Sequence, residues 1–458
     1  MKVFYEDKLT AMKFLFFVRD REEGLGERRI FRVVMKYLAT QETEVIKAII
    51  PLVAEYGRYD DLLELFDTPL EEYTINFLGE QIEKDALNYR AGKPVSLLAK
   101  WLPSINASSE KTKERARKII KHSKLTEAEY RKLLSTLRKY INVVERMMCA
   151  NEWENINYEG VPSRANLNYN DAFLRHDEER RREFLSKVEK GEKKINAGKL
   201  YPHDIVHKYM SGYRGIRTKD ETIEALWKAL PKKEIANTLV VADGSGSMTS
   251  TIGRTSVTAL EVANALAIYF AEHNKGEFSN KYITFSENPQ LVRFNKTASL
   301  HDKIATCLLH NEVANTNIER VFGLILKTAI DNNLSQEEMP KNILIISDME
   351  FDSCATCGDH KGYWDFEKPS KKLFKVIEEA YKSYGYKLPK LVFWNVNSRT
   401  GTIPMKENDL GVALVSGFST NIAEMIMNDK LDPLEILLDK LNTKRYEKVG
   451  KILKKVLQ

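Results

Sequence analysis

The chain has 458 residues, 43% of them hydrophobic and 30% charged, so it is long enough for about three domains with buried cores. This composition excludes collagen-like, mucin-like and wholly disordered proteins. The net charge is +6, from 71 Lys and Arg against 65 Asp and Glu, and so small an excess indicates a partner only through where the basic residues cluster.

Cysteine content and apolar segments indicate the cellular compartment of the protein. Four cysteines in so long a chain do not form a disulfide framework, so we expect a reducing, cytoplasmic setting. The apolar patch at 14–18 is too short for a membrane span and lacks the small residues of a signal-peptide cleavage site. We therefore expect no membrane anchor and no signal peptide.

The first half, residues 1–233, shows the apolar spacing of three or four residues that is typical of amphipathic helices. In the segment 127–148, for example, Tyr130, Leu134 and Leu137 belong to one apolar stripe, which other helices must bury. Helices of similar length with short connections suggest a stacked helical-repeat domain. The predicted helices are 9–18, 28–38, 44–56, 60–66, 72–89, 109–122, 127–148 and 177–190.

The second half, residues 234–458, alternates short apolar strands with helices. This order predicts a doubly wound, Rossmann-like α/β domain whose parallel sheet is covered on both faces. Ligands of such a sheet bind at the carboxyl ends of its strands. The predicted strands are 237–242, 281–285, 291–294, 342–347, 391–395 and 412–415, with the second and third forming a pair, and the predicted helices are 256–274, 318–332, 371–384, 421–428 and 433–441.

The most informative motif follows the first of these strands. Asp243 ends the strand, and Ser245 and Ser247 lie on a loop that Gly244 and Gly246 make tight enough to converge on one point. One carboxylate and two hydroxyls are hard oxygen ligands, which suit Mg²⁺ or Mn²⁺. The alternative is a Ser/Gly-rich loop that merely caps a helix.

Two further stretches supply oxygen ligands to the same edge. Asp348 ends the strand 342–347, as Asp243 ends its own, and Thr316 directly precedes a predicted helix. Thr306 is also available, but the setting Asn-Thr-Asn before a helix favours Thr316. This set leaves one position on the ion open, and we expect an anionic oxygen of a partner, carboxylate or phosphate, to fill it.

These residues resemble the metal-ion-dependent adhesion site of the von Willebrand factor A domain. That site pairs Asp-x-Ser-x-Ser with a separate Thr and a separate Asp, which correspond to Asp243, Ser245, Ser247, Thr316 and Asp348 in the same chain order. The resemblance implies that the second half is an A domain that holds a divalent metal ion.

A wider resemblance covers residues from about 9 to 428. The sequence is similar to a two-part family of unknown function that joins a helical segment to an A domain, and this order of parts is similar to the Ro (TROVE) proteins. The resemblance implies a HEAT-like, TROVE-like helical repeat over 1–233, an A domain over 234–458, and binding of non-coding RNA. The matching stretches are 18–20, 24–29, 56–62, 100–104, 130–133, 161–163, 202–203, 347–352, 393–397 and 415–419.

Basic residues of the helical half are the candidates for contacts with RNA. Between Lys111 and Lys139 there are eleven Lys and Arg against three Asp and Glu, which is the charge pattern of phosphate binding. The alternative is an ordinary solvated helix surface, and it is favoured for a second cluster at 175–194, where six acidic residues are interleaved. The candidate residues are Lys111, Lys113, Arg115, Arg117, Lys118, Lys121, Arg131, Lys132, Arg138 and Lys139.

Other motifs give weaker signals. Cys354 and Cys357, followed by His360, have zinc-like spacing, with Asp359 or Cys307 as a possible fourth ligand, but structural or incidental cysteines are the simpler interpretation. The sequence lacks a phosphate-binding loop, a dinucleotide motif and a nucleophile elbow. We therefore expect a protein that is not an enzyme.

Together these observations favour a cytoplasmic RNA-binding protein of Ro-like architecture. The basic helical half would bind non-coding or single-stranded RNA, while the A domain would hold Mg²⁺ (or Mn²⁺) and either engage a protein partner's carboxylate or brace the structure. The alternative function is a metal-dependent protein-interaction or assembly module that binds no RNA.

Overall fold

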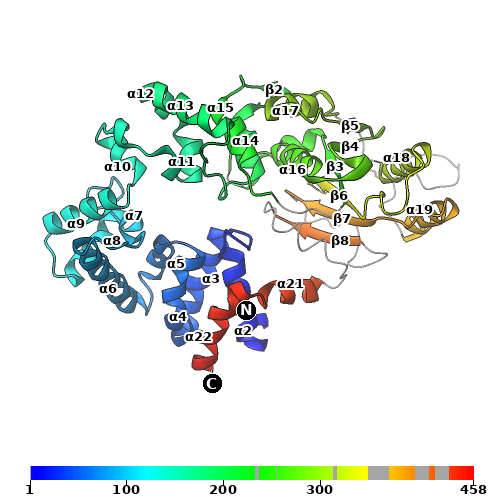
Figure 1. The fold of residues 1–458 in the computed structure, drawn as a ribbon. Helices are drawn as coiled ribbons and strands as arrows, with labels where there is room; N and C mark the ends of the chain where they lie inside the picture. The colour runs from blue at the N-terminus through cyan, green and yellow to red at the C-terminus, as the bar shows by residue number, and fades with distance from the viewer. Residues whose placement is uncertain are drawn as a thin grey trace. The chain divides into compact units, whose positions relative to one another are not determined.

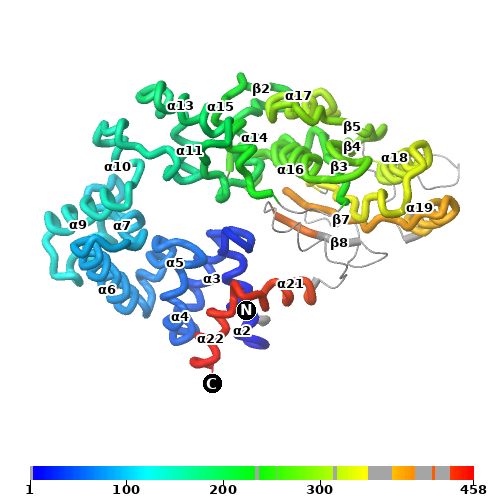
Figure 2. The backbone as a smooth tube through the Cα atoms, viewed as in Figure 1, coloured from blue at the N-terminus to red at the C-terminus, as the bar shows by residue number. Residues whose placement is uncertain are grey.

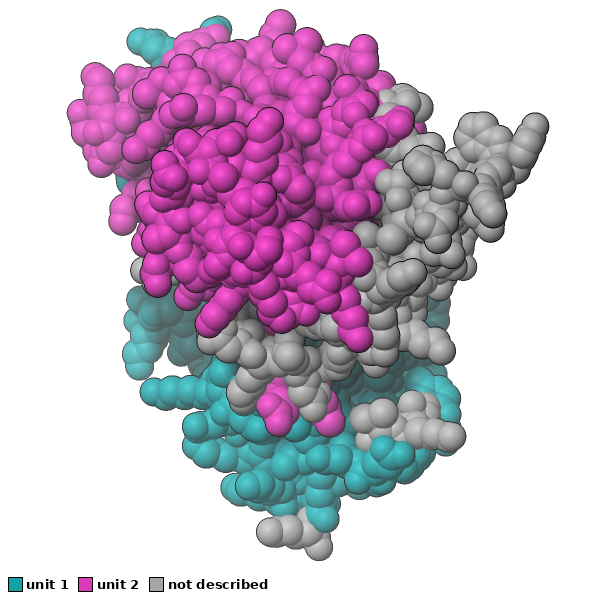
Figure 3. Space-filling view, turned by 90° about the vertical axis from the view of Figure 1, so that its right-hand side faces the viewer, with its two compact units in different colours: residues 1–161, 172–181, 437–458 teal, residues 162–171, 182–436 magenta. Residues whose placement is uncertain are grey.

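The structure is a computed structural model that describes residues 2–232, 237–253, 255–312, 317–348, 371–397, 412–417 and 433–457 (Figure 1). The chain divides into two compact units, which Figure 3 colours separately. Each unit consists of segments that are not continuous in the sequence, and the colours of the backbone tube in Figure 2 give their residue numbers. Unit 1 comprises residues 1–161, 172–181 and 437–458, and unit 2 comprises residues 162–171 and 182–436.

Unit 1 is helical, as the apolar spacing predicted. Its helices begin at recognisable caps: the side chain of Asp7 accepts a hydrogen bond from the Thr10 amide, and Thr126 and Glu129 form a capping box. The helices are α1 (Lys2–Glu6), α2 (Lys8–Arg19), α3 (Arg28–Gln41), α4 (Thr43–Ile49), α5 (Val53–Tyr56), α6 (Glu71–Arg90), α7 (Leu98–Trp101), α8 (Glu110–His122), α9 (Glu127–Tyr140) and α10 (Val144–Cys149), and α12 (Asn170–His176) and α13 (Glu178–Glu189) lie across the division.

Three predicted helices of this unit differ from the structure. The segment predicted as one helix at 44–56 consists of α4, the 3₁₀ turn Ile50–Leu52 and α5. The segment predicted as one helix at 127–148 is broken between α9 and α10, because Asn142 adopts a left-handed conformation with a φ of 52°. The Asn142 amide donates to the Lys139 carbonyl, and the Val143 amide donates to the Arg138 carbonyl, so the end of α9 is satisfied locally. The predicted helix at 60–66 is the 3₁₀ segment Tyr59–Leu65.

The C-terminal helix α22 (Glu447–Leu457) belongs to the helical unit. It packs on α2 and α4, and the preceding Arg445 and Tyr446 both donate hydrogen bonds to the buried carboxylate of Asp20. Tyr56 donates to the Arg445 carbonyl at 2.6 Å. The division between units therefore differs from the predicted one at 233 and 234. Residues 162–171 and 182–233 belong to unit 2, and residues 437–458 belong to unit 1.

Unit 2 contains the predicted strands and the helices that pack on them. The predicted helix at 421–428 lies outside the described residues, and α14, α15, α17 and the strands β1 and β2 were not predicted. The helices are α11 (Ser163–Asn168), α14 (Pro202–Tyr209), α15 (Glu221–Lys228), α16 (Ala259–His273), α17 (Leu300–Leu309), α18 (Ile318–Asp331), α19 (Lys371–Ser383) and α21 (Pro433–Leu441), the last crossing into unit 1, and the strands are β1 (Met210–Ser211), β2 (Gly215–Ile216), β3 (Thr238–Asp243), β4 (Lys281–Phe285), β5 (Leu291–Arg293), β6 (Asn342–Ser347), β7 (Lys390–Asn395) and β8 (Val412–Ser416).

The six strands β3–β8 form one sheet in the order β5-β4-β3-β6-β7-β8. All neighbours are parallel except β4 and β5, which pair as an antiparallel hairpin. The predicted parallel sheet and the predicted strand pair are both confirmed. The registers pair Ala242 of β3 with Ile346 of β6 and Asp243 with Phe285 of β4, so three strands end at one edge.

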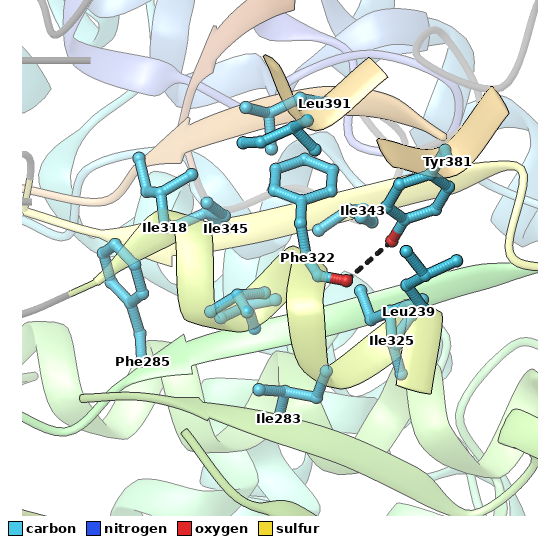
Figure 4. Packing of buried hydrophobic residues seen from close by; sticks show 14 of the residues in the cluster. Leu239, Ile283, Phe285, Ile318, Phe322, Ile325, Ile343, Ile345, Tyr381 and Leu391 are labelled. Carbon is cyan, nitrogen blue, oxygen red and sulfur yellow. Dashed lines mark hydrogen bonds between the residues drawn. The ribbon is translucent and has the colours of Figure 1, made fainter. Parts of the chain in front are cut away.

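Helices cover both faces of this sheet. Alternate residues of β3 and β6, such as Leu239 and Ile343, pack with α18 and α19 in the cluster of Figure 4. In that cluster the Tyr381 hydroxyl donates to the Phe322 carbonyl at 2.9 Å. On the other face α16 packs on β3, and the ring of its Phe270 contacts Trp394 of β7. A sheet covered on both faces has strands that are apolar throughout, which is why short apolar runs identified them in the sequence.

Candidate functional site

The predicted metal ligands that the structure describes, Asp243, Ser245, Ser247 and Asp348, fall at the carboxyl edge of the sheet. From β3 the chain continues outward through β4 and β5, and then returns to β6 on the other side of β3. Open parallel sheets bind ligands at such a switch point, outside the carboxyl ends of the strands. Asp243 is the last residue of β3 and Asp348 directly follows β6, so the fold brings both carboxylates to this position.

Asp243 is held in place by hydrogen bonds from its neighbours. The Ser245 amide donates to its Oδ1 at 2.9 Å, and the Ser347 hydroxyl donates to its Oδ2 at 2.7 Å. The hydroxyls of Ser245 and Ser247 lie 3.0 Å apart. Burial raises the pKa of Asp243 to about 6; these hydrogen bonds oppose the rise, and the charge of Asp348 adds to it.

The donor set at this edge fits a magnesium ion. Asp243 and Asp348 are buried carboxylates, and Ser245 and Ser247 are only partly buried, so hydroxyl oxygens remain accessible beside them. Magnesium is commonly bound through one or two carboxylates together with water or phosphate oxygens. Among the described residues no group of three or more His, Cys, Asp or Glu could hold a metal, so an ion here would depend on hydroxyls and outside oxygens.

Thr316 lies outside the described residues, which resume at Asn317. Asn317 caps α18 by accepting from the Arg320 amide, and its own amide donates to the carbonyl of Ser286, which follows β4. The start of α18 is therefore at the same edge as Asp243. The competing Thr306 is inside α17, where its hydroxyl donates to the Asp302 carbonyl at 2.9 Å.

Two neighbours of the metal motif were not predicted. Tyr213, from the turn between β1 and β2, donates a hydrogen bond to the Gly244 carbonyl at 2.8 Å, and burial raises the pKa of its hydroxyl. Asn311 packs so closely on Gly244 that a Cβ there would lie 3.0 Å from the Asn311 Cα. Two-residue strands and a loop asparagine carry no periodic signal, so only the structure reveals them.

The predicted RNA-binding residues on α8 are mostly engaged within the protein. Lys118 contacts Asp67 at 2.8 Å and Glu71 at 3.0 Å. Arg138 on α9 donates to the carbonyls of Ala99 and Leu102 and is half-buried. The remaining ion pairs within 4.0 Å among the described residues are Lys113 with Glu110, Arg115 with Glu64, Arg117 with Glu127, and Lys118 with Glu114.

The other half of the predicted set is exposed, and within the described parts of the chain it forms no ion pair. These cations therefore keep their charge available to a partner, whereas a cation that already contacts a carboxylate must exchange one anion for another. The five residues are Lys111, Lys121, Arg131, Lys132 and Lys139.

Two stretches without acidic residues pack together in this region. Residues 86–109 carry three Lys and Arg and residues 130–144 carry four, with no Asp or Glu in either. Tyr130 joins the stretches by donating to the Pro103 carbonyl, and Tyr140 donates to the Lys93 carbonyl. Tyr140 also contacts Tyr89 edge to face, with the ring centroids 5.1 Å apart, and both rings are more than a third exposed.

The second basic cluster serves the helical packing. Arg180 donates to the carbonyls of Trp153 and Ile156 and to the Asp177 carboxylate. The guanidinium of Arg181 is buried against the rings of Tyr158 and Phe173. Part of this cluster therefore packs within the fold instead of forming the solvated helix surface that the interleaved acidic residues predicted, since Arg181 is fully buried. Lys187 pairs with Glu183, and Arg182 lies 3.6 Å from Glu221.

The cysteines that are described have no metal ligands around them. Cys307 is fully buried in α17, and burial raises the pKa of its thiol to about 12. Cys149 is exposed. The zinc-like motif of Cys354, Cys357 and His360 lies outside the described residues.

None of the helices in the described ranges is both long and apolar enough to cross a membrane.

Comparisons with known proteins connect the chain to families without an assigned function. Residues 59–238 match a domain of unknown function, DUF2828, and residues 237–454 match a second one, DUF7788. The sequence is 29% identical over 480 residues to the uncharacterised protein L728 of Acanthamoeba polyphaga mimivirus, covering 95% of this chain and 80% of the viral protein. Among solved structures, the crystal structure of the Deinococcus radiodurans Ro (RSR) protein aligns with 93% of each chain, at 12% identity and a TM-score of 0.41.

Proposed function

We propose that this protein binds single-stranded RNA through a basic surface of its helical unit and holds Mg²⁺ (or Mn²⁺) at the carboxyl edge of its sheet, as a binding protein rather than an enzyme. The RNA would be non-coding, and the protein would act in the cytoplasm. The sheet unit would be a von Willebrand factor A domain, and the helical unit a HEAT-like repeat related to those of Ro proteins.

The observation that carries the RNA proposal is the pair of packed, acid-free stretches 86–109 and 130–144. A surface that lacks carboxylates attracts phosphates without competition from its own side chains. The exposed rings of Tyr89 and Tyr140 add faces on which bases can stack, and stacking of one base on an aromatic ring contributes about 1 to 3 kcal/mol. We call Tyr89, Arg90, Lys93, Lys139 and Tyr140 the tyrosine patch.

The experiment is fluorescence anisotropy with a labelled oligouridylate of twenty nucleotides, measured in EDTA over about 50 to 200 mM salt. We expect affinity to fall steeply with salt, and Tyr89→Ala with Tyr140→Ala to weaken it by about tenfold or more. Tyr384→Ala is the matched control, because Tyr384 is 60% exposed and belongs to the sheet unit. Binding that is absent at low salt, or that ignores salt, would remove the RNA proposal.

The metal proposal rests on Asp243, whose buried carboxylate receives hydrogen bonds only from a hydroxyl and an amide among the described residues. A buried carboxylate without a cation is costly, and a divalent ion would remove that cost. Asp243, Ser245, Ser247 and Asp348, with Thr316, would hold the ion, and when bound it would attract an anionic oxygen of a partner. Calorimetric titration with MgCl₂ tests this: binding to the wild-type chain and loss of binding in Asp243→Ala are expected.

A second function, metal-dependent assembly with a protein partner that supplies a carboxylate, uses the same edge without RNA. The exposed Glu312 beside Tyr213 adds negative charge to this edge. That charge repels a polyanion such as RNA more than it repels a partner that brings a single carboxylate to the metal. Capture of a protein that EDTA releases, from a preparation free of nucleic acid, would support this function instead.

A further inference from the structure

A short hairpin beside the metal motif is shaped to present two side chains. Strands β1 and β2 pair antiparallel, with Ser211 opposite Gly215, and the turn between them contains Tyr213 and Arg214. Gly212 has a φ of +70°, which favours glycine. A Cβ at Gly215 would lie 2.1 Å from the Ser211 carbonyl oxygen, so only glycine closes this turn.

The turn is fixed to the loop that carries the metal ligands. Tyr213 donates to the Gly244 carbonyl at 2.8 Å, and Gly244 stands between Asp243 and Ser245. Arg214 donates from Nη2 to the Asn311 carbonyl at 3.2 Å. Since Asn311 packs directly on Gly244, both turn residues lie against the same few atoms of the metal loop.

Donor groups remain available at this position. The side chain of Arg214 is exposed, and a guanidinium has five N–H donors, of which the described contacts use one. The Nδ2 of Asn311 is buried and has no hydrogen-bond partner among the described residues. A buried amide donor without an acceptor is a cost that an anionic oxygen nearby would relieve.

The charge around the turn favours a polyanion. Residues 205–219 contain no Asp or Glu, whereas they contain four Lys and Arg, and Arg217 and Lys219 are exposed. The exposed Glu312 opposes this charge from the neighbouring loop. A single carboxylate of a protein partner would use only one of these cations, but a phosphate chain can use several, since each phosphate carries its own charge.

We propose that the hairpin binds a phosphate of RNA at the metal edge. Arg214 would donate to one oxygen of this phosphate, and another oxygen would take the open position on the bound ion. Tyr213 is a positioning residue, because it holds the turn on the Gly244 carbonyl. This inference rests on the metal site of the proposed function. It adds a second contact for RNA, separate from the tyrosine patch, and it assigns the anion to nucleic acid instead of protein.

The experiment uses the full chain, a labelled oligouridylate of ten nucleotides, and two buffers of equal ionic strength that contain MgCl₂ or EDTA. Because the bound ion would contact the same phosphate as Arg214, we expect MgCl₂ to raise the affinity of the wild-type chain by about tenfold. Arg214→Gln should reduce this gain to about twofold, and Arg214→Lys should keep part of it. Calorimetric binding of Mg²⁺ alone should be unchanged in both variants.

Arg293→Gln is the matched control, since Arg293 is exposed on β5 and pairs with Lys281 at the start of β4, at the opposite edge of the sheet. It should behave as the wild-type chain. Equal gains from MgCl₂ in the wild-type chain and in Arg214→Gln would overturn the inference while the metal site stands. A chain that binds no Mg²⁺ would remove the metal site and the inference together. Competition by a glutamate-rich peptide, with none by inorganic phosphate, would overturn the choice of phosphate.

Discussion

Buried carboxylates occur in both units, and their partners differ. In the helical unit Asp61 is fully buried and contacts the guanidinium groups of Arg19 and Arg32 at 2.7 and 2.6 Å. Asp20 is paired in the same way with Arg445 at 2.8 Å, and these hydrogen bonds raise the pKa of Arg445. In the sheet unit Asp243 has no Lys or Arg within 4 Å among the described residues, and its hydrogen bonds come from Ser245 and Ser347.

This difference distinguishes carboxylates whose charge is compensated within the fold from a carboxylate that is available to bind an ion. A buried ion pair is complete within the fold, and breaking it costs several kcal/mol because one charge is left uncompensated. The chain even returns from its C-terminus to supply Arg445 to Asp20, 425 positions away. A buried carboxylate without a cation can also be satisfied by neutral donors, as Asp85 of the helical unit is by Gln81 and Ser96. Asp243 differs because the charge of a second buried carboxylate, Asp348, acts on it, and two such charges together favour a divalent ion.

The largest expected effect comes from breaking the buried ion pair between Asp61 and Arg19. Asp61→Ala leaves the buried side chain of Arg19 without its carboxylate, and we expect the helical unit to lose about 3 to 5 kcal/mol of unfolding free energy. Urea unfolding, with hydrogen exchange measured on peptides of α2 and α3, gives this value. Asp60→Ala is the control, because its partly exposed pair with Arg32 should cost about 1 kcal/mol or less. Equal costs for the two variants would contradict the distinction.

The second prediction concerns Mg²⁺ as the missing cation beside Asp243 of the sheet unit. At a concentration of MgCl₂ one hundred times the dissociation constant, we expect the sheet unit to gain about 2.7 kcal/mol of stability, because the ion binds the folded state. The gain should be absent in Asp243→Asn and should be reversed by EDTA. Thermal unfolding followed by hydrogen exchange in β3 and β6 measures it. A gain in the helical unit alone would argue against the edge of the sheet as the binding site.

The sequence predicted the parts of the molecule that local patterns encode. Apolar runs located all six strands of the sheet, and the two strand-ending carboxylates could be brought together because carboxyl ends of parallel strands share an edge. Helix spacing located most helices of the first unit. The break at Asn142 was missed because the apolar stripe continues across it while the backbone turns left-handed.

Other features depend on contacts between distant segments, for which one sequence gives no signal. Arg445 and Tyr446 contact Asp20 across more than four hundred positions, so local patterns do not reveal that the C-terminal residues pack with the helical unit. The same is true of Tyr213 and Asn311 at the metal loop, since neither belongs to a motif. Basic residues were counted correctly, but the carboxylates that engage Lys118 lie on other segments.

The third prediction tests the charge of Asp243 without metal. Burial raises its pKa from 3.8 to about 6 in the folded state, so folding favours the protonated form. The resulting stability is fully present below pH 3.8 and is lost as the pH rises through 6, by an amount of about 1 to 3 kcal/mol. In EDTA, Asp243→Asn should remove this pH dependence and be the more stable protein at pH 7. Unfolding curves at pH 5 and pH 7 compare the two; a wild-type sheet unit that gains stability toward pH 7 would contradict it.

The smallest effects extend the comparison to cations. Lys118 already contacts Asp67 and Glu71, whereas Lys139 is exposed and forms no ion pair among the described residues. If a completed pair is structural and an unpaired charge is available for binding, Lys139→Gln should weaken oligouridylate binding by about threefold. It should also reduce the salt slope by about 0.7, the value for one phosphate contact with a single strand. Lys118→Gln should leave both nearly unchanged. Anisotropy over the salt series measures them, and a larger loss in Lys118→Gln would mean that RNA displaces the carboxylates, so that contacts within the fold do not predict which cations bind.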